Sequence, residues 1–90
     1  MLTDHTIDRA AILAEVTDIF RTVLKDPCIE LTPEMTGDDL PAWDSMNHIA
    51  LVVEAECRFD IQFLTAEVED VASVGELMRM IQAKVARMHP

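Results

Sequence analysis

The sequence predicts an all-α fold, a bundle of three main helices plus one short helix, formed by one domain over residues 1–90. Apolar residues recur at three- and four-residue steps, and no segment alternates apolar and polar residues as a half-buried strand would. Hydrophobic residues make up 50% of the chain and only two residues are glycine, which is typical of a folded, helix-rich protein. Ninety residues suffice for one modest core and are too few for a deep cleft with its own lid.

The first helix is predicted over residues 7–25, where apolar residues line one face and charged residues fall between them. Pro27 then ends it. Residues 26–44 contain Pro33, Gly37 and Pro41 among Thr and Asp, which predicts a long structured loop. Its apolar residues are expected to anchor it in the core: Leu31, Met35, Leu40 and Trp43.

The second helix is expected to run from Ser45 to about Phe59, because Asp44 and Ser45 are both favoured at a helix N-terminus. After Asp60 the chain is expected to return to the core at Ile61, Phe63 and Leu64.

Two more helices follow along the chain. Thr65 is predicted to cap a short helix over residues 66–70. Ser73 and Glu76 have the spacing of a capping box, and Leu77, Met78, Ile81 and Val85 follow at helical spacing. The last helix is therefore predicted to be capped by Ser73 and to end near Arg87. Leu51, Phe59 and Ile81 are expected in the core.

The formal charge of −10 is concentrated in the middle of the chain, where residues 26–76 carry thirteen acidic residues and Arg58 as the one basic residue. Such a surface repels nucleic acid and anionic membranes and attracts basic protein partners. The alternative is that the acidity only confers solubility. The chain has no apolar run long enough to span a membrane and no secretory pattern, so we expect a soluble, cytoplasmic protein. We also expect it to be a monomer.

A metal site and a disulfide are not expected. The three His residues are scattered along the chain, and no calcium-binding loop is present. Cys28 and Cys57 are not in a CxxC arrangement, so both are expected to be reduced.

The segment from Asp39 to Ile49, DLPAWDSMNHI, resembles the acyl and peptidyl carrier family, whose members place an Asp-Ser-Leu-type motif at the start of the second helix. Here that motif reads Asp44-Ser45-Met46. The resemblance continues over residues 51–61 and 71–77, and therefore covers nearly the whole chain. It implies a discrete acyl carrier protein.

The resemblance implies that Ser45 carries a 4'-phosphopantetheine arm transferred from coenzyme A, and that the arm's thiol holds acyl groups as thioesters. Asp44 is implied to help hold the magnesium of the phosphopantetheinyl transferase. The expected partners are this transferase and the acyl-activating and acyl-transfer enzymes of fatty acid, polyketide or related biosynthesis. A serine in the first turn of a helix suits a phosphate group, because backbone N–H groups and the helix dipole favour an anion there. The alternative is that Ser45 is an ordinary N-cap.

The second helix carries two apolar stripes. At 100 degrees per residue, Leu51, Val52, Ala55 and Phe59 share one side, and a second group lies on another side: Met46, Ile49, Ala50, Val53 and Cys57. A bundle of this size is expected to bury the first stripe and to leave the second for partners. In the family, residues matching Met46, Ile49 and Val53 face outward and contact partner enzymes. The alternative is that both stripes belong to the core.

Partner recognition is expected to combine the Met46, Ile49 and Val53 stripe with the acidic residues Asp38, Asp39, Asp44 and Glu54. The helix is less acidic than is usual in the family, since it carries Asn47, His48 and Arg58. Trp43 before the motif resembles the variant found in carriers of specialised pathways.

Parts of the sequence are compatible with two other functions. Asp44, Ser45 and His48 could suggest a hydrolytic triad, but Ser and His three residues apart on one helix have no third group to orient the His and no oxyanion site. We therefore expect no enzyme activity, and expect His48 to be a satisfied, partly buried polar residue. The alternative to a modified carrier is an unmodified helical protein–protein interaction module that keeps the carrier fold.

Overall fold

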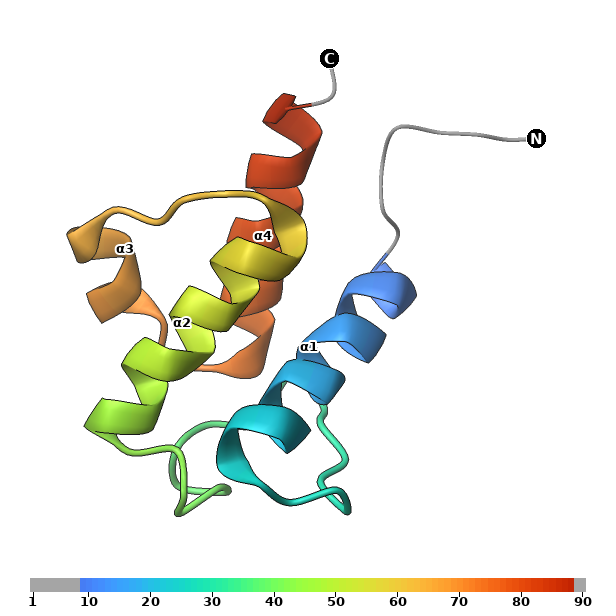
Figure 1. Cartoon of the computed structure of the whole chain (residues 1–90), viewed down its shortest axis with the longest axis vertical. Helices are drawn as coiled ribbons and strands as arrows, with labels where there is room; N and C mark the ends of the chain where they lie inside the picture. Colours follow the sequence, from blue (N-terminus) through green and yellow to red (C-terminus); the bar gives the residue numbers. More distant parts are fainter. Residues whose placement is uncertain (1–8, 89–90) are drawn as a thin grey trace.

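The computed structural model describes residues 9–88 and shows four helices and no strand in that range. The helices are α1 (Arg9–Leu24), α2 (Ser45–Phe59), α3 (Thr65–Asp70) and α4 (Val74–Met88). The long helices α1, α2 and α4 pack on one another, and the short α3 lies on the side of α2 and α4 that faces away from α1 (Figure 1). The prediction of an all-α bundle with three main helices and one short helix is confirmed.

The helix boundaries differ slightly from the prediction. Residues 7 and 8, predicted to open the first helix, lie outside the described residues. α1 ends at Leu24 because Lys25 adopts a left-handed backbone conformation with φ of 58°, so the helix ends before Pro27 is reached. The left-handed residue Asp60, with φ of 55°, likewise ends α2, and its N–H group donates to the Glu56 carbonyl oxygen.

The short helix begins one residue earlier than predicted. Thr65 is its first residue, and Leu64 takes the cap position that was assigned to Thr65. The Leu64 N–H group donates to Glu67 Oε1 at 2.8 Å, so the Glu67 carboxylate helps to start the helix. This is the half of a capping box that the third helical residue supplies, and the leucine at the cap has no side-chain oxygen to supply the other half.

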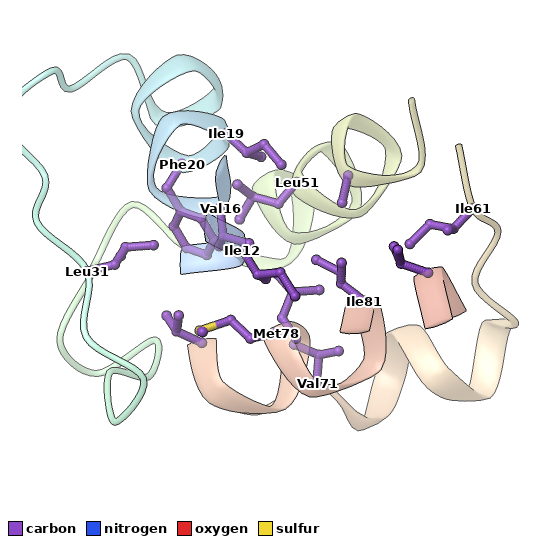
Figure 2. Close-up of a cluster of buried hydrophobic side chains, with 14 of the residues drawn as sticks. Ile12, Val16, Ile19, Phe20, Leu31, Leu51, Ile61, Val71, Met78 and Ile81 are labelled. Atoms are coloured by element: carbon purple, nitrogen blue, oxygen red, sulfur yellow. The ribbon is translucent and has the colours of Figure 1, made fainter. Parts of the chain in front are cut away.

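The core is apolar throughout, and no polar or charged residue among those described is buried. Figure 2 shows Ile12 and Phe20 of α1 pointing toward Leu51 of α2 and Ile81 of α4. Leu51 and Ile81 are 1% and 0% exposed, as predicted for core residues.

Three residues are less buried than predicted. Phe63, which was expected to return to the core with Ile61, packs against the core but remains partly exposed. Phe59, the last residue of α2, packs against the core but remains partly exposed. Leu64 was predicted to return to the core and is 70% exposed. The reason is that α3, which Leu64 precedes, buries none of its own residues.

The loop between α1 and α2 is anchored as predicted. Leu31 is buried, and Met35, Leu40 and Trp43 are partly buried against the core. The Trp43 ring packs edge-on against the Phe20 ring of α1, with 5.0 Å between ring centroids. These contacts fix the segment that leads into α2.

The same loop is joined to the start of α4 by a seam of backbone hydrogen bonds, which we call the loop–α4 seam. Thr36 and Ser73 form an isolated antiparallel bridge. The N–H group of Val74 donates to the Met35 carbonyl oxygen at 2.9 Å, and that of Gly75 donates to the Pro33 carbonyl oxygen at 2.8 Å. A Cβ atom at Gly75 would lie 2.9 Å from this oxygen, so the close approach requires glycine.

Candidate functional site

Ser45 is the first residue of α2, and its side chain is exposed. Asp44 is the N-cap, since its backbone is extended and its Oδ1 accepts a hydrogen bond from the Asn47 N–H group at 2.9 Å. Asn47 in turn donates through Nδ2 to the Ala42 carbonyl oxygen at 2.8 Å. The cap is therefore made by Asp44, which leaves the Ser45 hydroxyl available for another use.

The first turn of α2 is suited to an anion. The N–H groups of Ser45 and Met46 have no acceptor within the helix, because the first turn of any α-helix lacks the preceding carbonyl groups. The positive end of the helix dipole adds to their effect. Both residues are exposed, so a phosphate joined to the Ser45 hydroxyl would have these donors beside it without any loss of core contacts.

A hollow of about 380 Å³ lies beside Ser45, between the loop, α2 and α3. Polar and apolar residues both line it: Gly37, Trp43, Ser45, His48, Ile49, Val68, Glu69, Val71 and Ala72. A chain attached at Ser45 therefore begins at the edge of a surface hollow. The exposed serine, the unpaired N–H groups and the adjoining space together fit a phosphodiester-linked arm.

His48 is a satisfied, partly buried residue. Its Nδ1 accepts a hydrogen bond from Trp43 Nε1 at 2.9 Å, and its Nε2 lies 2.8 Å from the Val68 carbonyl oxygen. One neutral tautomer, with the hydrogen on Nε2, makes both bonds. Because both ring nitrogens are engaged, His48 has no free nitrogen with which to activate Ser45, and the residues 44, 45 and 48 do not form a hydrolytic triad.

The second apolar stripe of α2 faces solvent. Met46 is 83% exposed, Ile49 55% and Val53 51%. Leu51, Val52 and Ala55 on the other side are buried. The expectation of one buried and one exposed stripe therefore holds, and Leu64 is a further exposed apolar residue that the sequence did not indicate.

The acidic residues near α2 differ in their surroundings. Asp38 and Asp39 are exposed in a turn in which Asp39 Oδ2 accepts from the Thr36 N–H group at 3.0 Å. Glu54 is instead paired with Arg58, whose Nε lies 3.0 Å from Glu54 Oε2. Four acidic residues were expected to attract partners. Three of them, Asp38, Asp39 and Asp44, have no cation beside them among the described residues, whereas Glu54 has Arg58.

Arg58 joins α2 to α1 through its carboxylate partners. Its Nη1 lies 2.6 Å from Asp18 Oδ2 and 3.4 Å from Glu15 Oε1. Hydrogen bonds from Asp18 and then from Glu54 raise the pKa of the guanidinium further above its ordinary value. Exposed ion pairs contribute little to stability, so the main consequence is that a positive charge offsets Glu54 on this part of α2.

Residues 9–88 show neither a cluster of metal-ligating side chains nor a membrane-spanning helix. No group of three or more His, Cys, Asp or Glu residues in this range is placed to bind a metal ion. None of the helices described is both long and apolar enough to cross a membrane. Cys28 and Cys57 are free thiols, and both are exposed.

We expect Asp44→Ala to lower the free energy of unfolding by about 1 kcal/mol, because the Asn47 N–H group loses its acceptor. Asp44→Asn should restore most of that loss, since asparagine caps a helix about as well as aspartate. Urea denaturation of the two variants measures both values. A loss in Asp44→Asn equal to that in Asp44→Ala would show that the charge, and not the cap, is what stabilises the helix.

Comparison with solved structures identifies the class of protein. The chain is 38% identical to the holo acyl carrier protein from Geobacter metallireducens, over 86% of this chain and 88% of that one, with a TM-score of 0.80. The crystal structure of an acyl carrier protein from Thermotoga maritima has the same fold, with a TM-score of 0.82 at 21% identity over 94% and 99% of the two chains. Scans of protein-family models and of curated proteins gave no match.

The chain belongs to the acyl carrier protein family. Its role is that of a carrier, and proteins of this class carry a group between enzymes rather than catalyse the reactions themselves. The resemblance drawn from residues 39–49 is confirmed.

Proposed function

We propose that Ser45 is the attachment site of a 4'-phosphopantetheine arm and that the chain delivers acyl groups on this arm to biosynthetic enzymes. The observation that carries the proposal is the exposed Ser45 hydroxyl in the first turn of α2, next to an N-cap made by Asp44. The relative from Geobacter metallireducens is a holo acyl carrier protein, which supports the arm as the group in question. When attached, the arm supplies a thiol that carries an acyl group as a thioester.

The attachment step needs a partner enzyme. The Ser45 oxygen attacks the phosphorus that bears the pantetheine in coenzyme A, the bond from this phosphorus to the nucleotide breaks, and adenosine 3',5'-bisphosphate leaves. The hydroxyl proton must pass to a base. Among residues 9–88 no side chain forms a hydrogen bond with Ser45, and both ring nitrogens of His48 are already engaged. We therefore assign the base to the phosphopantetheinyl transferase.

The proposal is tested by the intact mass of the protein after incubation with coenzyme A, magnesium and a broad-specificity phosphopantetheinyl transferase. The expected result is the gain of one phosphopantetheinyl group and no more. Absence of any gain with several such transferases would contradict the proposal and favour an unmodified interaction module with the carrier fold.

We propose that partners dock on the exposed stripe of α2 formed by Met46, Ile49 and Val53, and that Asp38, Asp39 and Asp44 steer basic partners toward it. The stripe is apolar and exposed, and the three acids lie in the loop and cap that lead into the same helix. Charges act at longer range than apolar contacts, so they govern association, while apolar contacts govern dissociation. Glu54 lies on α2 too, but Arg58 offsets its charge.

We expect Met46→Ala to weaken binding of the transferase about tenfold, chiefly through faster dissociation, as the loss of a central apolar contact typically does. The thermal midpoint should change little, because Met46 is 83% exposed in the free protein. Surface plasmon resonance at several salt concentrations separates the two rates. Raising the salt to ~1 M, where the Debye length is ~3 Å, should slow association of wild type and variant alike. Equal dissociation rates for the two proteins would place recognition in the loop before Ser45.

A further inference from the structure

Trp43, in the loop that leads to Ser45, is held by contacts from two helices. Its ring packs edge-on against Phe20 of α1, with 5.0 Å between ring centroids. Its Nε1–H group donates to His48 Nδ1 of α2 at 2.9 Å, and the two rings are stacked with 6.0 Å between centroids. The Trp43 backbone N–H group donates to the Leu40 carbonyl oxygen at 2.8 Å and closes the turn before the cap. The position of the Trp43 ring therefore sets the position of this turn.

The hydrogen bond from Trp43 requires a neutral His48 ring. An indole N–H group can only donate, so His48 Nδ1 must carry no hydrogen if it is to accept. Nε2 then carries the ring hydrogen and faces the Val68 carbonyl oxygen at 2.8 Å. A protonated ring carries hydrogen on both nitrogens and turns a donor toward the Trp43 donor. Protonation therefore breaks the bond to the loop and leaves the bond to α3 in place.

Two carboxylates face His48. Glu69 of α3 lines the same hollow as the His48 ring, and Asp44 caps α2 one turn before it. Both carboxylates favour a positive ring, whereas the bond from Trp43 favours a neutral one. The other lining residues from the loop and from the segment after α3 carry no charge: Gly37, Val71 and Ala72. Since histidine is the side chain that changes charge near neutral pH, the bond between Trp43 and His48 is exposed to control by pH.

We infer that neutral His48 is a positioning residue for the modification of Ser45: it holds Trp43, and with it residues 40–44, in the arrangement that the transferase binds, and it releases them when it is protonated. The inference rests on the proposed attachment at Ser45. Residues 40–44 bear on that reaction because they end in Asp44 and lead directly to the modified serine. Attachment should therefore depend on pH through the carrier as well as through the enzyme.

Two substitutions separate the contacts of His48. His48→Asn places a carbonyl oxygen, which does not titrate, near the position of Nδ1 and so keeps an acceptor for Trp43. Its side chain is too short to reach Val68, whose carbonyl oxygen still accepts from the Val71 N–H group at 3.4 Å. Asparagine and histidine have similar helix propensities, so the helix is matched. His48→Leu offers Trp43 no acceptor at any pH.

The first measurement is the nuclear magnetic resonance signal of the indole N–H group, which has one source because Trp43 is the one tryptophan of the chain. It uses the unmodified protein, so its outcome does not depend on Ser45. Between about pH 8 and about pH 5.5, the wild-type signal should move toward that of His48→Leu, while the His48→Asn signal stays constant. His5 and His89 are present in all three proteins, so the comparison isolates His48.

The second measurement is kcat/KM of a phosphopantetheinyl transferase for each carrier, from the rate of mass gain. Mass gain of wild type at about pH 8 is established first, so a failure of Ser45 to accept the arm is seen separately from any effect of His48. The wild-type value divided by the His48→Asn value cancels the pH dependence of the enzyme itself.

This ratio should be near one at about pH 8 and fall about fivefold at about pH 5.5, the factor expected for the loss of one net hydrogen bond. His48→Leu should be about fivefold slower than His48→Asn at both pH values. A wild-type indole signal that does not move would overturn the inference, and so would a ratio that does not change with pH. A His48→Asn protein that is already slow at the higher pH would also contradict it, because the contact with Val68 would then be the one that matters.

Discussion

Ser45→Ala is expected to abolish the mass gain that coenzyme A and a phosphopantetheinyl transferase give to the wild-type protein. The substitution removes the hydroxyl oxygen that would form the new bond to phosphorus, and no neighbouring side chain can take its place at the same point of the turn. The folded structure should be unaffected, because Asp44 and not Ser45 caps α2, and because the Ser45 side chain is exposed. Intact mass and the far-ultraviolet circular dichroism spectrum check both halves of this prediction.

Thr65→Ala is the matched control for the loss of an exposed hydroxyl at the start of a helix. Thr65 is the first residue of α3, as Ser45 is of α2, and its side chain is exposed too. The Thr65→Ala protein should gain one arm at the wild-type rate. A gain that persists in Ser45→Ala and disappears in Thr65→Ala would move the attachment site from α2 to α3.

Leu51→Ala should lower the free energy of unfolding by about 2 to 5 kcal/mol, which is a large share of the 5 to 15 kcal/mol typical of a small domain. Leu51 is 1% exposed and points into the cluster formed by α1, α2 and α4 (Figure 2), so its truncation leaves a cavity that the surrounding helices fill only in part. Urea denaturation followed by circular dichroism measures the change, and a chelator should have no comparable effect.

Val53→Ala, two residues further along the same helix, is the control for this measurement. Val53 is 51% exposed, so its truncation should change the free energy of unfolding by less than about 0.5 kcal/mol. The contrast tests the assignment of the two stripes of α2. A loss of stability at Val53 as large as that at Leu51 would make both stripes part of the core and would remove the proposed docking surface.

The long helices could be predicted from the sequence because their signals are local. Apolar spacing and the acids and hydroxyls at the caps identify α2 and α4 within a residue or two. At the start of α4, Ser73 Oγ accepts from the Glu76 N–H group at 3.2 Å, as its spacing predicts. The Glu76 carboxylate, however, accepts from the N–H group of Ala72 and not from that of Ser73, a detail that depends on the loop–α4 seam.

The contacts that the sequence did not indicate join residues that are distant along the chain. His48 was expected to be a satisfied polar residue, but its partner on α3 is a backbone carbonyl group twenty residues away, and a carbonyl group carries no sequence signal. The ion pair between Arg58 and Asp18 also joins residues that are forty positions apart, and the sequence pattern of either helix alone does not predict it. The error at Leu64 has a related cause, since apolar character alone does not show whether a neighbouring element is close enough to cover it.

The loop–α4 seam also bears on when the site forms during synthesis of the chain. The segment before Ser45 is paired with Ser73, Val74 and Gly75, which leave the ribosome some forty residues later. A nascent chain that ends before Ser73 lacks the N–H donors to Pro33 and Met35, and it also lacks the Ile81 side chain against which the other helices pack. The loop that leads to Ser45 can therefore be anchored at Pro33, Met35 and Thr36 only after residues 73–75 have been added to the chain, whereas the cap at Asp44 is closed by neighbours in sequence.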